Sequence, residues 1–502
     1  MKKETRFLIL LLSFIMAAQA ASCGNTSTAS DDTTPADDTT TAAENVDPNS
    51  VLALPEMDWK GRQFRVMGVR DDTYPQLWNT FEIDAEAENG DVVNDSVFRR
   101  NMVIEDKYNV EIVELYYDGG YGKSSTNLTQ SILANEDLHD LVFIAMNKCG
   151  PMAREGYFYD LNKVDYIDFT KKWWSKSAND ALEYDGKLFF ASSDLALRDK
   201  SRSGFLTYNR EMIERYKLEN PVDLVREGTW TLDNMLQMIE DVSTDLNGNT
   251  KVDEDDSFGL GFGSVHATAF FLITGAQNFT TVTDSTGKLV LNVVSDRALT
   301  TIDKLMKATV DPAQVMMVNH WTGETLTEGD PNTLAHRTFY KGNMLFVGSF
   351  ADTLKDYSTN CDFEYGMLPN PKFDEAQEKY YSYADPESLL MSIPVTCPDP
   401  DFTGFMLEAL SEASTETTKK AYLETVCRVK YVVDQESAEM LDIALSNVIY
   451  DPAVIFNITG IKDIWTQVMG SNKNTLASAY ASIKEAAEAD IVKISEDFAK
   501  FE

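Results

Sequence analysis

The sequence predicts an α/β fold with more than one sheet, and three observations support this. Short apolar runs typical of buried strands alternate with segments whose apolar residues recur at helical spacing. About 450 residues follow a polar N-terminal stretch, which is enough for two or three domains, and 43% of all residues are hydrophobic. No internal repeat is visible, which argues against a solenoid.

The first elements follow a strand–helix–strand order. Residues 62–69 predict a buried strand, and residues 81–87 predict a second extended piece before a turn. The next segment predicts a helix, since four apolar residues fall on one stripe: Val93, Val97, Ile104 and Tyr108. Residues 110–117 return to a strand pattern, and this order is typical of a mostly parallel sheet.

Later elements continue the alternation. Residues 140–146 predict another buried strand, followed by a turn at residues 147–151. Thr231 is a candidate N-cap for the helix that follows Trp230. We assign Trp230 to packing because it lies just before that helix. Short strands separated by helices come next, and roughly the last hundred residues predict helices.

The N-terminus predicts a signal peptide, residues 1–22. Basic residues precede an apolar stretch, residues 7–20, that is too short to span a bilayer and ends in small residues. Residues 20–23, Ala-Ala-Ser-Cys, resemble a bacterial lipobox, in which Cys23 would be lipidated. The alternative is an ordinary secretory signal with an incidental cysteine.

Residues 23–50 predict a disordered tether. They contain almost no large apolar side chains and so cannot bury a core. No later segment has the length and apolarity to cross a bilayer. The sequence therefore predicts a domain that a lipid anchor holds on the outer side of the cell membrane, extracellular or periplasmic.

Charge and cysteine spacing limit the partners. The formal net charge is −37, which argues against nucleic acid and anionic lipid and favours neutral or cationic ligands. Four further cysteines lack the spacing of a zinc site or a redox motif: Cys149, Cys361, Cys397 and Cys427. Disulfides and buried free thiols are both open for them.

No motif of a known catalytic chemistry is visible. The histidines show no metal-ligand spacing: His139, His266, His320 and His336. Residues 259–264 are rich in glycine but lack the lysine of a phosphate-binding loop. We therefore expect a protein that is not an enzyme. An extracellular glycan hydrolase is the alternative, because its paired carboxylates are recognised only in space. A surface glycan- or peptide-binding protein without a transporter is a third interpretation.

Five segments together resemble bacterial extracellular solute-binding proteins of family 1, the maltose-binding-like group. They are residues 91–112, 140–161, 228–260, 339–350 and 363–386. The resemblance implies a lipoprotein that captures a small solute and delivers it to the permease of a carbohydrate ABC importer. A sugar or oligosaccharide is the favoured solute, and a peptide is the alternative. We expect a monomer.

The resemblance also implies a two-lobed periplasmic-binding-protein type II fold with the ligand cleft between the lobes. The first lobe would comprise residues 51–198 and about 386–428, and the second lobe residues 203–383 and about 429–502. Residues 192–201 and 380–388 would carry two crossovers between the lobes.

Residues 245–256, DLNGNTKVDEDD, predict a calcium-binding loop. Oxygen atoms occupy the ligand positions of an EF-hand loop: Asp245, Asn247, Asn249, the Lys251 carbonyl, Asp253 and Asp256. Thr250 replaces the usual glycine and Asp256 the usual glutamate, so we expect a weak site of about 10⁻⁴ to 10⁻³ M, which suffices outside cells. A solvated acidic turn is the alternative. Members of the resembled family often carry such a loop in the second lobe, which favours a structural Ca²⁺.

Sugar-binding sites combine aromatic faces with carboxylates or amides that bind hydroxyl groups. The candidates are therefore aromatic residues beside polar groups in predicted loops, and polar residues at strand ends or crossovers. The predicted ligand-binding residues are Tyr74, Trp78, Asn147, Trp173, Trp174, Trp321, Tyr381, Tyr383, Asp385 and Glu387. The group at residues 381–387 ranks first because crossing strands line the cleft. For each single aromatic residue, a place in the core is the alternative.

Overall fold

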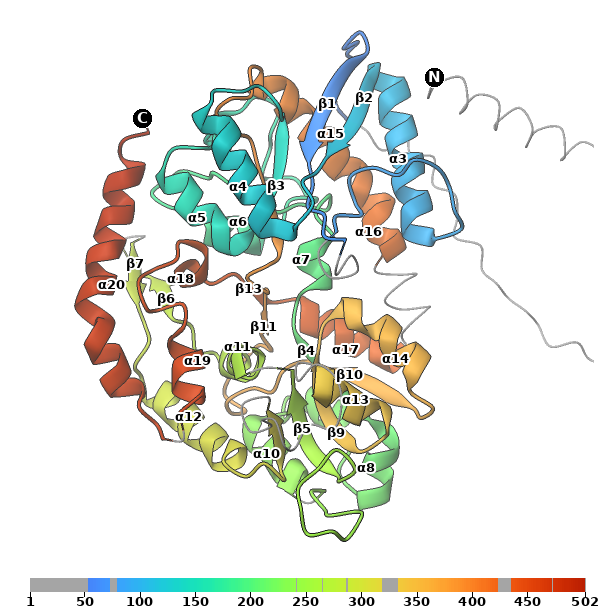
Figure 1. Cartoon of the computed structure of the whole chain (residues 1–502), viewed down its shortest axis with the longest axis vertical. Helices are drawn as coiled ribbons and strands as arrows, with labels where there is room; N and C mark the ends of the chain where they lie inside the picture. The colour runs from blue at the N-terminus through green and yellow to red at the C-terminus, as the bar shows by residue number, and fades with distance from the viewer. Residues whose placement is uncertain are drawn as a thin grey trace, which may run out of the picture. The chain divides into compact units, whose positions relative to one another are not determined.

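Two β-sheets organise the protein, and Figure 1 shows one above the other. The computed structural model describes residues 53–72, 79–240, 242–263, 265–285, 288–317, 333–422, 435–471 and 473–501. All of them belong to one compact unit, residues 46–502. The mixture of sheets and helices agrees with the α/β class predicted from the sequence.

The first sheet has four strands in the order β12–β3–β1–β2. β1 is parallel to β2 and β3, and β12 adds an antiparallel edge beside β3. The strands are β1 (Arg62–Met67), β2 (Val110–Leu115), β3 (Leu141–Ala145) and β12 (Leu389–Ser392). Every residue of β3 is buried, which explains its continuous apolar sequence.

Helices connect the parallel strands of this sheet. α3 (Val92–Tyr108) begins at Asp91, whose side chain accepts hydrogen bonds from the N–H groups of Val93 and Asn94. The predicted apolar stripe of this helix is buried, as expected. The other helices around the sheet are α4 (Gly120–Leu133), α5 (Met146–Arg154), η2 (Leu161–Lys163), α6 (Lys176–Leu182), α15 (Pro400–Glu416) and α16 (Thr418–Lys420).

The second sheet has five strands in the order β10–β4–β9–β5–β8. β5 is parallel to β8 and β9, whereas β4 is antiparallel to β9 and β10. The strands are β4 (Phe205–Asn209), β5 (Phe258–Phe262), β8 (Val315–Met317), β9 (Met344–Ser349) and β10 (Tyr365–Leu368). A separate antiparallel pair is formed by β6 (Thr281–Thr283) and β7 (Leu289–Leu291).

The helices around the second sheet include the predicted helix after Trp230. The Trp230 side chain is fully buried and its Nε1 donates to the carbonyl oxygen of Pro369 at 2.9 Å, so its packing role is confirmed. Thr231 Oγ1 accepts from the N–H of Asn234 at 3.4 Å, as an N-cap does. The helices are α8 (Arg210–Tyr216), α9 (Pro221–Glu227), α10 (Leu232–Glu240), α11 (Val265–Gly275), α12 (Asp296–Thr309), α13 (Leu334–Tyr340), η5 (Ala351–Thr353), α14 (Leu354–Asn360) and α17 (Gln435–Leu445).

The C-terminal segment contacts helices that pack around both sheets. α18 (Pro452–Ile455) packs on α5 and α6, and α19 (Ile464–Met469) packs on α11. α20 (Leu476–Phe498) runs along the left side of Figure 1 and contacts α12 and β7 as well as α5. The sequence assigns this whole segment to the second lobe, whereas its contacts are shared between the two.

Residues 81–87 form bends, so the prediction of an extended strand there is wrong. Side chains of α3 donate the hydrogen bonds that a neighbouring strand would otherwise provide. Arg100 donates to the carbonyl oxygens of Glu82 (2.7 Å) and Ile83 (3.1 Å), and Asn101 also donates to Ile83 (2.9 Å). A buried arginine therefore satisfies backbone groups that a strand would pair.

Residues 147–151 lie inside α5, so the predicted turn is also wrong. Pro151 lacks the N–H that a helix interior uses, which is the origin of the turn signal. Close packing of α18 on α5 favours the helix. Gly150 permits that packing, because a Cβ there would lie 2.3 Å from the carbonyl oxygen of Ile455. Tertiary contact outweighs the local preference.

The predicted signal peptide, the tether and Cys23 lie outside the described residues. Among the helices that the structure describes, none combines the length and the apolarity needed to cross a bilayer.

Candidate functional site

Three described chain segments pass between the two sheets and lie side by side. The first two pair through backbone hydrogen bonds of 3.1 Å, from Gly204 to Tyr383 and from Asp385 to Arg202. The third joins them through the parallel pair β11 (Ser382–Tyr383) and β13 (Val448–Ile449), which Figure 1 shows between the sheets. The first segment follows α7 (Arg198–Ser201). Any rotation of one lobe against the other must bend these segments together.

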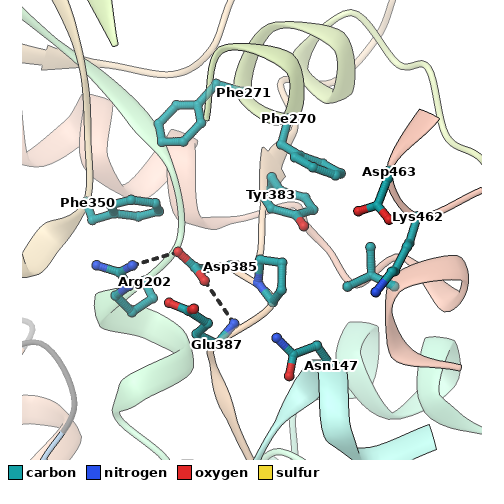
Figure 2. Close-up of a pocket in the computed structure, with 12 residues that line it drawn as sticks. Asn147, Arg202, Phe270, Phe271, Phe350, Tyr383, Asp385, Glu387, Lys462 and Asp463 are labelled. Atoms are coloured by element: carbon teal, nitrogen blue, oxygen red, sulfur yellow. Dashed lines mark hydrogen bonds and ion pairs between the residues drawn. The ribbon is translucent and has the colours of Figure 1, made fainter. Parts of the chain in front are cut away.

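A cavity of about 370 Å³ lies beside the crossing segments (Figure 2). This volume falls within the roughly 300–1,000 Å³ of typical ligand pockets. Its walls come from the crossing segments, from α5 of the first lobe, from elements of the second lobe and from the C-terminal segment. The lining residues are Asn147, Arg202, Phe270, Phe271, Phe350, Tyr383, Asp385, Pro386, Glu387, Val454, Lys462 and Asp463. Both lobes therefore contribute to one cavity, as a cleft between lobes requires.

Arg202 links two crossing segments through an ion pair that is largely shielded from water. Its Nη2 donates to Oδ2 of Asp385 at 2.7 Å, and only 12% and 11% of the two side chains are exposed. Nη1 lies 3.5 Å from Oδ2 of Asp352, and the guanidinium stands 4.3 Å from the centroid of the Phe350 ring. Burial alone lowers the pKa of Arg202, but the surrounding carboxylates, Asp385 foremost, outweigh it and raise the pKa above its usual value. Arg202 thus stays charged and holds Asp385 in the cavity wall.

Four aromatic rings form the apolar wall of the cavity. Figure 2 shows Phe270 stacked on Tyr383, with ring centroids 4.3 Å apart and an interplanar angle of 20°. Phe271 and Phe350 meet edge to face at 5.3 Å. Gly204 makes room for this wall, since a Cβ there would lie 2.5 Å from the Phe271 ring. The first crossing segment is therefore in direct contact with the aromatic wall.

Three buried polar atoms of the lining residues lack a hydrogen-bond partner among the described residues. They are the hydroxyl of Tyr383, Oδ1 of Asn147 and Nε of Arg202. Asn147 is held at the start of α5, where its backbone N–H donates to the carbonyl of Pro386 at 2.9 Å. An unpaired buried polar group costs about 1–3 kcal/mol. Among them, the Tyr383 hydroxyl can donate to a bound molecule and Oδ1 of Asn147 can accept from it.

Glu387 adds a carboxyl group with a raised pKa. Burial is the main cause of this rise and the negative charge of Asp385 is the second, while the hydrogen bond from Tyr121 to Oε1 (3.0 Å) opposes it. The backbone N–H of Glu387 donates to Oδ1 of Asp385 at 2.8 Å, so the two acidic residues are neighbours in the wall. Such carboxyl groups, together with the amide and the aromatic rings, suit a molecule that has both hydroxyl groups and C–H faces.

The structure brings four of the predicted ligand-binding residues to this cavity: Asn147, Tyr383, Asp385 and Glu387. Three of them come from the crossover at residues 380–388. These three residues lie close together because residues 380–388 lead directly into β12 of the first sheet.

Three other predicted residues are placed elsewhere. Trp173 and Trp174 are buried in the core, where both indole N–H groups donate to the carboxylate of Glu408 at 3.0 Å. Burial of this carboxylate raises the pKa of Glu408 to about 7. Tyr381 packs edge to face on Phe279 at 5.3 Å and does not line the cavity. The remaining predicted residues lie outside the described part of the chain: Tyr74, Trp78 and Trp321.

Most aromatic and basic residues of the cavity are not predicted from the sequence. Arg202 comes directly after the predicted crossover at residues 192–201, so a longer crossover would have included it. Phe270 and Phe271 lie in an apolar segment, so the sequence does not distinguish them from core residues. Lys462 and Asp463 carry no sequence signal at all. Only the fold brings these positions together.

The predicted calcium loop, residues 245–256, is held by hydrogen bonds among its own groups. Asp245 accepts from two backbone N–H groups, at 2.7 and 2.9 Å. The carboxylate of Asp253 accepts from the side-chain amides of Asn247 (3.0 Å) and Asn249 (2.6 Å). Oxygen donors of this kind suit Ca²⁺, but both amides would have to turn their oxygen atoms inward. Within the described residues, no group of three or more Asp, Glu, His or Cys side chains is placed to hold a metal ion.

Three cysteines are free thiols: Cys149, Cys361 and Cys397. Burial raises the pKa of the Cys149 thiol, so it behaves as a small apolar side chain. Cys427 lies outside the described residues.

Residues 104–422 match the sequence model of the bacterial extracellular solute-binding protein family. The match covers well over half of the chain, so the protein belongs to this family. The resemblance noted in the sequence is confirmed.

Solved structures show the same fold. One is a cyclo/maltodextrin-binding protein complexed with maltotetraose, with a TM-score of 0.55, 16% identity, and coverage of 87% of this chain and 97% of that chain. Another is an ABC substrate-binding protein from Listeria monocytogenes in complex with cycloalternan, with a TM-score of 0.53, 13% identity, and coverage of 88% and 99%. A third is a maltose/maltodextrin-binding domain from Bdellovibrio bacteriovorus bound to maltotriose, with a TM-score of 0.51, 13% identity, and coverage of 87% and 100%. No curated protein sequence matches the chain. The two-lobed periplasmic-binding-protein fold is thus confirmed.

Proposed function

We propose that this solute-binding protein captures a sugar or oligosaccharide in the cavity between its lobes and delivers it to the permease of an ABC importer. The composition of the cavity wall carries this proposal. Aromatic rings, adjacent carboxyl groups and an amide acceptor meet there from both lobes.

The wall chemistry matches a polyhydroxylated ring. Aromatic faces bind the C–H faces of a sugar, while Asp385 and Glu387 accept hydrogen bonds from its hydroxyl groups. The Tyr383 hydroxyl, which has no partner among the described residues, supplies a donor, and Oδ1 of Asn147 supplies an acceptor. A ligand that touches Asn147 of the first lobe and Phe350 of the second favours the closed arrangement of the lobes.

The similar structures support the same ligand class. Their bound molecules are maltotetraose, cycloalternan and maltotriose, and a further one, from Agrobacterium radiobacter, holds ribitol. That last match has a TM-score of 0.52 and 12% identity. All four molecules are rich in hydroxyl groups, and we extend this chemistry to the present cavity.

Isothermal titration calorimetry tests the proposal with monosaccharides, linear and cyclic oligosaccharides, polyols and short peptides. A sugar at 100 times its dissociation constant also stabilises the protein by about 2.7 kcal/mol, which a thermal-shift screen detects. Asn147→Ala removes an acceptor without breaking a described hydrogen bond, so it should weaken sugar binding about three- to tenfold. Asn360→Ala, at an exposed position on α14, is the matched control and should bind as the parent does. Binding of peptides alone would overturn the sugar assignment.

The family and the similar structures are binding proteins rather than enzymes. We propose that the bound sugar leaves this protein chemically unchanged. Incubation with oligosaccharides followed by chromatography should return only the starting material. Shortened products would support the alternative of an extracellular glycan hydrolase.

We also propose that the protein is a monomer anchored to the membrane through lipidated Cys23. The lipobox-like residues 20–23 and the polar tether support this. Expression of Cys23→Ala in a bacterial host should shift the protein from the membrane fraction to the soluble fraction. Gel filtration of that variant should give the mass of a single chain.

Calcium binding by residues 245–256 is a further part of the proposal. The spacing of its oxygen-bearing residues supports a weak structural site. Chelator-treated protein should therefore gain melting temperature in millimolar Ca²⁺, and Asp245→Asn should remove that gain. Asp362→Asn, an exposed carboxylate elsewhere, should keep it. An equal melting temperature with and without Ca²⁺ would leave the loop as a solvated acidic turn.

A further inference from the structure

We propose that a second cavity, lined by residues of α6, the β6–β7 pair and α18, binds a small organic cation. Its volume is about 280 Å³, and it shares no lining residue with the cavity proposed for the sugar. The inference does not depend on the sugar site.

The charge of the walls favours a cation. Asp180, Glu183 and Asp451 line the cavity, and none of its described lining residues is Lys, Arg or His. Lys176 neutralises Asp180 at 2.8 Å. Glu183 and Asp451 make no ion pair with any described residue. The sugar cavity differs, because Arg202 and Lys462 line it.

Asp451 is the strongest single indication. Its side chain is buried, with 6% exposed, and its hydrogen-bond donors are neutral. The hydroxyl of Thr280 donates to Oδ2 at 2.6 Å, and the N–H of Ala453 donates to Oδ1 at 2.9 Å. Buried charges in proteins are normally paired with an opposite charge. Burial also raises the pKa of Asp451, and a cation in the adjacent cavity would provide the missing opposite charge.

Aromatic side chains make the rest of the wall suitable for an organic cation. Tyr184, Phe279 and Phe456 line the cavity, and the rings of Tyr184 and Phe456 lie 5.5 Å apart. Ammonium groups are attracted to aromatic faces within about 6 Å. A bare metal ion would need several ligands at once, and no such cluster of Asp, Glu, His or Cys side chains exists among the described residues. A substituted ammonium satisfies both the carboxylate and the rings.

Calorimetry with choline and with its uncharged isostere 3,3-dimethylbutan-1-ol tests the inference. Choline should bind at least tenfold more tightly than the isostere, since only choline carries the charge. Asp451→Asn keeps an N-cap at α18 and an acceptor for Thr280 but removes the charge, so it should weaken choline binding at least tenfold. Glu485→Gln on α20 removes an exposed carboxylate that does not line the cavity, so it should leave choline binding unchanged.

Three results would overturn the inference: equal affinity for the two probes, no binding of choline, or unchanged choline binding in Asp451→Asn. If Asp451→Asn fails to fold, Glu183→Gln at the exposed rim replaces it and should weaken choline binding at least twofold. Asn147→Ala, which should weaken sugar binding, should leave choline binding unchanged. The proposal of sugar binding and the proposal of cation binding are therefore tested independently.

Discussion

Replacing Arg202 by methionine is expected to lower the free energy of unfolding by about 3–5 kcal/mol, the usual loss when one partner of a buried ion pair is removed. The ion pair with Asp385 spans 2.7 Å, and the two side chains are 12% and 11% exposed. Asp352, 3.5 Å from the same guanidinium, would also lose this ion pair. Methionine keeps an apolar contact with the Phe350 ring, so the change reports mainly on charge.

Urea denaturation followed by intrinsic fluorescence measures this loss. Arg226→Met is the matched control, because its guanidinium pairs with Glu439 at 2.7 Å but is 41% exposed. Solvent screens such a pair, so the control should unfold at the same urea concentration as the parent. The double variant Arg202→Met with Asp385→Asn should recover part of the lost stability, since it no longer leaves the Asp385 carboxylate unpaired.

The reasoning is refuted if Arg202→Met unfolds at the same urea concentration as Arg226→Met. That result would mean that water screens the crossing segments as fully as it screens the surface. It would also remove the argument that Arg202 positions Asp385 for a ligand.

Three further outcomes are expected. Tyr383→Phe removes a hydroxyl without a described partner, so stability should be kept while sugar affinity measured by calorimetry falls about three- to tenfold; an unchanged affinity would contradict this. Burial raises the pKa of Glu114 to about 8 from about 4.5, so the folded state binds this proton more tightly than the unfolded state and loses stability as the pH rises between these values. Glu114→Gln should make the melting temperature less dependent on pH in that interval, and an identical pH profile would speak against the assignment. Gly204→Ala should cost about 1–3 kcal/mol through overlap with the Phe271 ring, whereas Gly122→Ala in α4, with open space around it, should not destabilise the protein in the same melting experiment.

The local sequence was sufficient to predict the helices and strands whose burial follows from the spacing of their apolar residues. The buried stripe of α3 and the continuous apolar run of β3 follow from side-chain spacing alone, because each element must bury one face or both. The crossover at residues 380–388 was implied by the family resemblance, and it delivered Tyr383, Asp385 and Glu387 to the cavity.

The tertiary structure decided which side chains face the ligand. Trp173 and Trp174 look like a sugar platform in the sequence, but Glu408, more than two hundred residues later, binds both indole N–H groups in the core. Arg202, Phe270 and Phe350 lie far apart along the chain and meet only because the two sheets and their crossing segments bring them together. Periodicity reports whether a residue is buried, whereas the partner across a cavity depends on long-range packing that no local window contains.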